Sequence, residues 1–185
     1  LLEHRNFRYI DGDILDLSKL RKAMQDVDIV IHLASIAGVG MVVAHPVLTL
    51  KINLIGSYHV LECVRELKKV ERYIDFSTSE VYGPHVYKAD EDGMTTQGPI
   101  GQPRWIYAVG KLASEHLSHS YYREYGIPCV SIRPFNVYGP RQQGEGAVHH
   151  FVKNAILNQD LIVHDDGNQV RSWIYIDDFV EGVLL

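Results

Sequence analysis

The chain of 185 residues has a globular composition, with 46% hydrophobic and 22% charged residues, enough to build a sizeable core in about one domain. Its formal net charge of −5 and its scattered Lys and Arg residues provide no basic face, so we expect no nucleic-acid partner. Cys63 and Cys129 lie in apolar segments and predict buried, reduced thiols in a cytoplasmic protein.

Neither an apolar run of membrane-spanning length nor a signal-peptide pattern occurs, so we expect no membrane span and no export signal. No metal-ligand spacing is present. His149 and His150 are adjacent and cannot face one ion from a helix, so we expect them at the surface or lining a pocket.

Apolar strands alternate with amphipathic helices along the chain. The predicted strands cover residues 7–10, 28–34, 72–77, 129–133, 161–163 and 170–176. The predicted helices cover 18–24 with Ser18 as cap, 46–68, 105–125, 147–158 and a final one capped by Asp177 or Asp178. This alternation predicts βαβ units in an α/β fold, a Rossmann-like doubly wound parallel sheet.

Two segments are predicted to be loops. Residues 83–104 hold several Gly and Pro residues with charges between them, and Gly38-Val-Gly40 follows an apolar strand. Ligand sites in open parallel sheets lie at the carboxyl ends of the strands. Thr78 is placed at such an end, directly after the strand predicted at 72–77.

Tyr107 and Lys111 are the most informative pair of side chains in the sequence. They stand four residues apart where a helix is predicted to begin, so both lie on one helix face. A free Tyr titrates near pH 10, and a neighbouring cation favours its ionised form. With a hydroxyl at Thr78 to share the proton, these residues predict a site that takes a proton from an alcohol while a hydride leaves the same carbon.

Several motifs, in this order, make the chain resemble the extended short-chain dehydrogenase/reductase family, in its NAD-dependent nucleotide-sugar epimerase/dehydratase branch. The motifs are Gly12-Asp-Ile14, His32-Leu-Ala-Ser35, Asn53-Leu-Ile-Gly56, Ser77-Thr-Ser-Glu-Val-Tyr-Gly83, Tyr107-x-x-x-Lys111, Arg133-Pro-Phe-Asn-Val-Tyr-Gly-Pro-Arg141 and Arg171-Ser-Trp-Ile-Tyr-Ile-Asp177. The resemblance covers nearly all 185 residues. It implies a partial NAD-binding Rossmann domain over 1–185, with the substrate-binding part starting after about residue 140.

The resemblance also assigns roles to individual residues. Tyr107 would be the base, with Lys111, Thr78 and Glu80 as the other catalytic residues, and Lys111 would also bind the nicotinamide ribose. The other cofactor-binding residues would be Asp13 and Ile14 at the adenine, Leu33, Ala34, Ser35 and Asn53 along the cofactor, and Pro134 and Phe135 at the nicotinamide. The nucleotide-diphosphate sugar would be bound by Ser79, Asn136 and Arg171.

Three of these residues have a structural alternative. Asp13 could close a turn, Asn53 could tie a helix to a loop, and Arg171 could form a surface pair.

The chain departs from the family pattern at both ends. The family opens with a strand and a Gly-rich turn that takes the pyrophosphate, and nothing here precedes the expected third strand. We therefore expect a piece of a longer protein, with the first βαβ unit and the C-terminal substrate region outside these residues, and a homodimer for the full-length parent.

The resemblance leaves several chemistries open. Family members oxidise C4 of the sugar, pass the hydride to NAD and diverge from the 4-keto intermediate. We rank sugar-nucleotide 4-epimerase first, UDP-uronate decarboxylase second because Thr78-Ser-Glu80 and Pro103-Arg-Trp-Ile-Tyr107 are similar to such enzymes, and 4,6-dehydratase third because Ser79 replaces its usual Asp. A catalytically silent NAD-binding sensor or scaffold is the alternative from another class.

Overall fold

The computed structural model describes residues 4–67, 69–144 and 146–185. The chain divides into two compact units, Leu1–Ile132 and Arg133–Leu185. Both are built from parallel strands and helices, which confirms the predicted Rossmann-like α/β class.

The first unit contains a three-stranded parallel sheet in the order β1-β2-β3. Its strands are β1 (Ile29–His32), β2 (Arg72–Phe76) and β3 (Cys129–Ile132). The register places His32 beside Asp75 and Asp75 beside Ser131. Because the strands are parallel, their carboxyl ends meet at one edge of the sheet.

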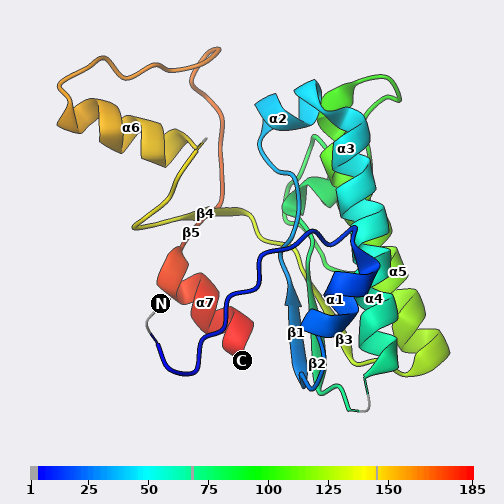
Figure 1. Cartoon of the computed structure of the whole chain (residues 1–185). Helices are drawn as coiled ribbons and strands as arrows, with labels where there is room; N and C mark the ends of the chain where they lie inside the picture. The colour runs from blue at the N-terminus through cyan, green and yellow to red at the C-terminus, as the bar shows by residue number, and fades with distance from the viewer. Residues whose placement is uncertain (1–3, 68, 145) are drawn as a thin grey trace. The chain divides into compact units, whose positions relative to one another are not determined.

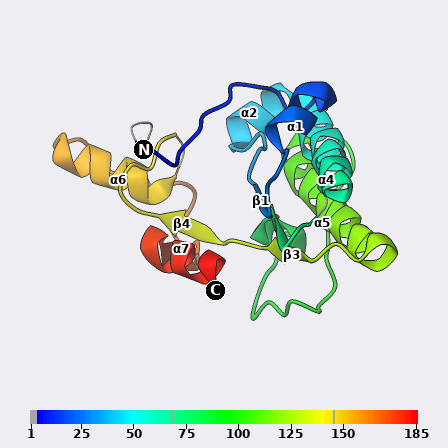
Figure 2. The same cartoon turned by 60° about the horizontal axis from the view of Figure 1, so that its bottom comes forward.

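Helices α1 (Leu17–Ala23), α4 (Ser57–Glu66) and α5 (Ile106–Tyr125) pack along the sheet of this unit, and Figures 1 and 2 show α4 and α5 on the same side of the strands. The apolar core lies between them. Its buried members are Met24, Val60, Leu61, Cys63, Val64, Tyr73, Tyr121 and Ile127. Truncating a side chain such as Leu61, which has no exposed surface, to Ala costs about 2–5 kcal/mol in a core of this kind.

The helix predicted over 46–68 forms as three consecutive segments. They are α3 (Pro46–Leu50), a π-helical turn (Lys51–Gly56) and α4, which ends at Glu66. Lys68 lies outside the described residues. Helix Pro46–Glu66 is long and apolar enough to cross a membrane by length and composition alone. It is also a core helix of this unit, with Asn53, Ser57 and Leu61 buried against its neighbours, and core helices meet the same criteria.

Other helical segments differ from the sequence predictions. The N-cap of α1 is Asp16, whose carboxylate accepts from the Lys19 N–H at 3.0 Å, and not Ser18. The Gly38-Val-Gly40 segment was expected to be a loop, but Gly38 precedes helix α2 (Val39–Ala44). Short 3₁₀ helices form over Ser79–Tyr82 (η2) and, inside the predicted loop at 83–104, over Pro103–Trp105 (η3).

Two predicted strands do not form. Residues 7–10 and 161–163 have no strand pairing among the described residues, and the apolar side chains in both segments are exposed. Alternating or continuous apolar residues form a strand only where a neighbouring strand completes the hydrogen-bond ladder and a layer covers the side chains. Neither condition is met at these positions in the described part of the chain.

The second unit contains two parallel strands and two helices. Strands β4 (Asn136–Tyr138) and β5 (Trp173–Tyr175) pair with Asn136 opposite Trp173. The helices are α6 (Ala147–Ile156) and α7 (Ile176–Leu184). The N-cap of α7 is Tyr175, so Asp177 and Asp178 lie in the first turn and do not cap it. His149 and His150 stand side by side on α6, and neither is buried.

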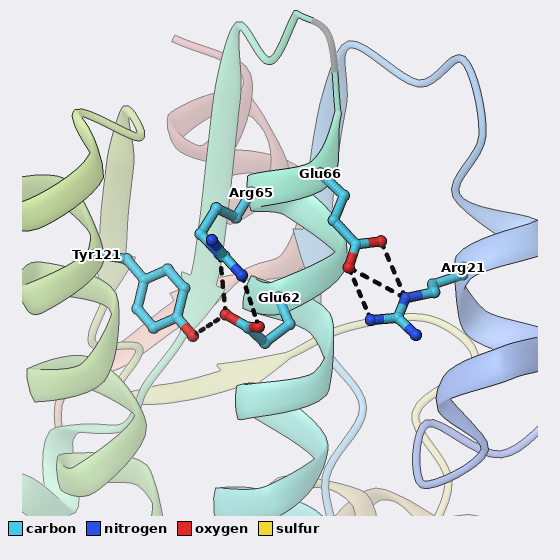
Figure 3. Close-up of polar contacts among 5 residues, drawn as sticks. All are labelled: Arg21, Glu62, Arg65, Glu66 and Tyr121. Carbon is cyan, nitrogen blue, oxygen red and sulfur yellow. Dashed lines mark hydrogen bonds and ion pairs between the residues drawn. The ribbon is translucent and has the colours of Figure 1, made fainter.

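Polar contacts join the outer sides of the helices in the first unit (Figure 3). Glu62 on α4 accepts hydrogen bonds from Arg65 and from the Tyr121 hydroxyl at 2.6 Å, and Glu66 forms a forked pair with Arg21. These contacts tie α4 to α5 and to α1. Because the Arg21–Glu66 pair is solvent-exposed, its contribution to stability is about 0–1 kcal/mol.

Both cysteines are free. Cys63 is buried as predicted, but Cys129 is only half-buried.

Candidate active site

The edge where the strands of the first unit end gathers the predicted catalytic residues of that unit. Residues 33–35 follow β1, and residues 77–80 follow β2. The Ser77 N–H donates to the Ile132 carbonyl at 2.8 Å and extends the pairing of β2 with β3. Thr78 then leaves the sheet in extended conformation and caps η2, its hydroxyl accepting from the Glu80 N–H at 3.3 Å. The Thr78 side chain is thereby fixed at the carboxyl end of β2.

Tyr107 lies near Thr78 although the loop of residues 83–102 separates η2 from α5 in the sequence. The loop is fixed to η2 because the Thr96 N–H donates to the Val81 carbonyl at 3.1 Å. Pro103 then starts η3, and α5 follows with Tyr107 in its first turn and Lys111 in its second. The Thr78 hydroxyl lies close enough to the Tyr107 phenol to lower its pKa. The structure therefore brings together Thr78, Tyr107 and Lys111 as the sequence predicted.

The electrostatics of Tyr107 differ from the sequence prediction. Burial raises the pKa of Tyr107, the Glu80 carboxylate raises it further, and the Thr78 hydroxyl opposes both. We expected Lys111 to lower the pKa of Tyr107. The pKa is raised instead, so that expectation is wrong. The physical reason is that Tyr107 is half-buried and desolvation disfavours the phenolate.

Glu80 has a cationic neighbour that the sequence analysis did not identify. Burial raises the pKa of Glu80, and the charge of Arg104 lowers it. Arg104 is exposed on η3, with its guanidinium 4.6 Å from the centre of the Trp105 ring. Gly98 lets that ring lie close, since a Cβ at Gly98 would stand 1.9 Å from the indole nitrogen. The signal in the sequence was the run Pro103-Arg-Trp. The sequence alone does not show that Arg104 lies near Glu80.

A second set of polar side chains, also not anticipated, lies on the sheet below Tyr107 and Lys111. His32, Asp75 and Ser131 occupy one register row across β1, β2 and β3. His32 shares a hydrogen bond of 2.9 Å with the Ser57 hydroxyl, and Asp75 accepts from the Ser114 hydroxyl at 3.1 Å.

Burial sets the protonation of this row. It lowers the pKa of His32 to about 4, an effect that the charge of Lys111 increases. It raises the pKa of Asp75 to about 6, and here Lys111 and Ser114 act in the opposite direction. His32 is therefore neutral at pH 7, whereas Asp75 is mostly ionised.

Asn53 holds the turn after β1. Its side-chain oxygen, in the π-helical turn, accepts from the Ser35 hydroxyl at 2.9 Å and from the Ile36 N–H at 3.3 Å. The structural alternative for Asn53, a tie between helix and loop, is what the contacts show. Because α5 passes directly over this residue, Gly110 is the helix position that faces it, and a Cβ there would lie 2.9 Å from the Asn53 Cβ.

Asp13 and Ile14 form a turn before α1. The Asp13 carboxylate accepts from the Leu15 N–H at 2.9 Å, so it closes a turn, and its side chain is exposed. Ile14 packs on Gly56, where a Cβ would stand 2.2 Å from its Cδ1. Leu33 is exposed after β1. The adenine and cofactor roles of these residues stay predictions.

The remaining predicted site residues belong to the second unit. Pro134 and Phe135 follow β3, and Asn136 begins β4, where its amide donates to the Ser172 carbonyl at 3.2 Å. Arg171 is exposed and donates to the Val170 carbonyl. Their roles toward a nicotinamide or a sugar diphosphate stay predictions, as does the role of the half-buried Ser79. Among the described residues, no group of three or more His, Cys, Asp or Glu could hold a metal ion.

Comparison with known proteins identifies the family. A sequence model described as the NAD dependent epimerase/dehydratase family matches residues 2–185. The chain belongs to this family. The resemblance seen in the ordered motifs, that of an extended short-chain dehydrogenase/reductase, is confirmed.

Relatives within the family carry out different reactions. The chain is 30% identical to dTDP-D-glucose 4,6-dehydratase of Dictyostelium discoideum, covering 97% of this chain and 43% of that protein. It is 33% identical to UDP-N-acetyl-alpha-D-glucosaminuronate decarboxylase of Bacillus cytotoxicus, covering 97% and 56%. The chain thus spans about half the length of these curated relatives.

Solved structures in the family show the same fold. UDP-glucuronic acid 4-epimerase of Bacillus cereus, in complex with UDP-glucuronic acid and NAD, superimposes with a TM-score of 0.87 and 34% identity. The match covers 99% of this chain and 56% of that one. UDP-N-acetylglucosamine 4-epimerase of Methanobrevibacter ruminantium superimposes with a TM-score of 0.88 at 27% identity, covering 98% and 58%.

Proposed function

We propose that the complete protein is an NAD-dependent enzyme that oxidises C4 of a nucleotide-diphosphate sugar, and that it is a sugar-nucleotide 4-epimerase. The observation that carries the proposal is the grouping of Thr78, Tyr107 and Lys111 at the carboxyl end of β2, where the Thr78 hydroxyl acts on the Tyr107 phenol. A silent sensor or scaffold has no chemical need for these three residues together, so the site favours an enzyme.

The residues present fit NAD. The Ser77 hydroxyl and the Asn53 amide nitrogen are buried beside this edge and have no hydrogen-bond partner among the described residues. Lys111 supplies a buried cation, and Tyr107 lies one turn before it. Asp13, Ile14 and residues 33–35 would hold the adenosine half, and Lys111 the ribose next to the nicotinamide. Bound NAD would accept the hydride from C4 and bring a positive ring charge to the site.

Each of the three residues would have a defined task. Tyr107 would take the proton from the C4 hydroxyl through its phenol oxygen. The Thr78 hydroxyl would hold the same substrate oxygen and stabilise the phenolate, since it lowers the pKa of Tyr107. Lys111, one helical turn away, would keep a positive charge beside the phenolate. Oxidation at C4 gives a 4-keto sugar, which an epimerase turns over and reduces on the other face.

Decarboxylation of a uronate is a second candidate, favoured by Glu80 and Arg104. A 4-keto uronate loses CO2 once its carboxylate is held and a proton is supplied. Arg104 is exposed next to Glu80 and offers the planar fork of donors that matches a carboxylate. Glu80, whose pKa is raised by burial, offers a proton donor. A 4,6-dehydratase ranks third because Ser79 stands where its acid is expected.

We further propose a cytoplasmic homodimer that acts on a small molecule and not on nucleic acid or membrane. Both thiols are free, which suits a reducing compartment. Exposed aromatic side chains on α4 and α5, namely Tyr58 and Tyr125, supply apolar surface that a second subunit would cover.

The test is Tyr107→Phe in the complete protein, assayed with a panel of UDP- and dTDP-sugars and read by product mass. Loss of the base should lower turnover by about 10²- to 10⁴-fold while NAD binding persists. Tyr122→Phe is the matched control, because Tyr122 is an exposed tyrosine of the same helix, and its turnover should be unchanged. Turnover of Tyr107→Phe close to wild type would remove the assignment of Tyr107.

A further inference from the structure

The polar row under the site is an unusual feature for a parallel sheet. The covered face of a parallel sheet is normally lined by apolar side chains. One row further from the site, the same face carries Val30, Tyr73 and Cys129, whereas the row nearest the site carries His32, Asp75 and Ser131. Asp75 is the central member of its row and has no exposed surface. A buried carboxylate at this position requires a compensating charge or hydrogen bonds.

Hydrogen bonds satisfy only one of the two carboxylate oxygens of Asp75. Its Oδ2 accepts from the Ser114 hydroxyl, and the same hydroxyl lies 3.1 Å from the Lys111 carbonyl oxygen. Its Oδ1 is buried and has no hydrogen-bond partner among the described residues. The Ser118 hydroxyl also favours the Asp75 carboxylate, but neutral hydrogen bonds offset only about 1 kcal/mol each, far less than the cost of burying an ion. The rest of the compensation must come from a nearby charge.

Lys111 is the cation that supplies this charge. Only 2% of its surface is exposed, and it stands one turn before Ser114 on α5, directly over the row. Asp75 is the charge that acts on Lys111, and Lys111 is the first charge that acts on Asp75. We infer that Asp75 is a positioning residue, whose carboxylate keeps the Lys111 ammonium charged and in place one turn from Tyr107. This role rests on the function proposed above.

Other groups facing Asp75 do not replace this charge. His32 on β1 is neutral, since burial keeps its pKa at about 4. The pKa values of the buried Tyr73 on β2 and of the half-buried Cys129 on β3 are raised by desolvation, so both groups are neutral too. Glu115 on α5 repels Asp75, and the pKa of Tyr107 is raised by burial, by Glu80 and by Asp75 itself. Lys111 is therefore the positive partner of Asp75 in this part of the first unit.

The pairing has a functional consequence. Burial alone lowers the pKa of Lys111, and Asp75 opposes that effect. Without the carboxylate, Lys111 would lose its proton at lower pH. The cation required beside Tyr107 and at the cofactor ribose would then disappear at the alkaline end of the working range.

The test compares Asp75→Asn with wild type in the complete protein. The amide keeps the size of the side chain and removes its charge, while Ser114→Ala removes the hydrogen bond to Asp75 and keeps the charge. Lysine labelled with ¹³C at Cε reports the pKa of Lys111 directly by NMR, with Lys111→Arg to assign the signal. The pH dependence of NAD affinity is the second measurement.

We expect Asp75→Asn to lower the pKa of Lys111 by about one unit or more, as for loss of an opposite charge at close range. The alkaline loss of NAD affinity should move to lower pH by the same amount, and Ser114→Ala should move neither. An unchanged Lys111 pKa in Asp75→Asn would overturn the inference. Asp75→Ser, which repeats the residue type of Ser131, gives the same comparison if Asp75→Asn does not fold.

The NMR measurement separates this inference from the proposed function. If the wild-type protein turned over no nucleotide sugar, the proposed function would fail, while the Lys111 pKa would still decide whether Asp75 is its counter-charge. A uniform fall in activity with no shift along the pH axis would show that Asp75 supports the fold only.

Discussion

Gly110→Ala tests how tightly α5 packs on the π-helical turn that holds Asn53. Gly110 lies in the interior of α5, between Tyr107 and Ser114. At an unhindered helix position, replacing Gly by Ala stabilises a protein by about 1 kcal/mol. Here the added Cβ would lie 2.9 Å from the Asn53 Cβ, closer than two carbon atoms can approach without movement.

The magnitude follows from two opposing effects. Forcing one extra carbon into a packed contact costs about 1–3 kcal/mol, and the helix propensity of Ala returns about 1 kcal/mol. We therefore expect a net loss of up to about 2 kcal/mol, which lowers the melting temperature by about 2–4 °C per kcal/mol for a chain of this size. Asn53→Ala should not relieve the strain, because the close atom is the Asn53 Cβ itself.

Thermal and urea unfolding followed by circular dichroism provide the measurement. Gly182→Ala is the control, since Gly182 lies in helix α7 and a Cβ there meets nothing within 4 Å. That substitution should be neutral or stabilising by up to about 1 kcal/mol. If Gly110→Ala raised the melting temperature as much as Gly182→Ala, the close packing of α5 on Asn53 would be refuted.

Two further predictions concern pH and the later chemistry. The pKa of His32 is lowered from 6.5 to about 4, so its contribution to stability is lost as pH falls from 6.5 toward 4. The pKa of Asp75 is raised from 3.8 to about 6, so its ionisation costs the folded state more as pH rises through that range. These effects oppose each other in the wild type. His32→Gln should therefore lose stability from pH 4.5 to 6 in urea unfolding where the wild type changes little, and equal slopes for the two proteins would contradict this. Glu80→Gln should keep most activity in a 4-epimerase but cost about 10²-fold or more in a decarboxylase or dehydratase. Accumulation of NADH in that variant would count against the epimerase, and a clean isomer at wild-type rate would count against the other two.

The sequence alone determined the fold class and the helix face that Tyr107 and Lys111 share. Strands 28–34, 72–77 and 129–133 were predicted within a few residues of β1, β2 and β3, because a continuous apolar run between helical segments is the pattern of a covered parallel strand. The spacing of Tyr107 and Lys111 placed them on one helix face, because residues four apart are neighbours on a helix surface. Local periodicity is sufficient for both, since each depends on residues that are neighbours along the chain.

Strand pairing and helix capping were less accessible to sequence. Residues 7–10 and 161–163 have apolar patterns but no partner strand among the described residues, and whether an apolar segment pairs depends on a distant segment. The caps of α1 and α7 were misplaced by two or three residues. Several Asp and Ser residues near a helix start can each serve as a cap, and only the backbone conformation selects among them.

Only the tertiary structure decided the charges around the site. Asp75 and His32 lie 43 residues apart in sequence, yet the parallel register sets them side by side under Lys111. Arg104 became a charged neighbour of Glu80 only because the loop brings the two residues together. The pKa of Tyr107 was predicted in the wrong direction, because spacing along a helix reveals a neighbouring cation but not the depth of burial, and here desolvation is the larger effect.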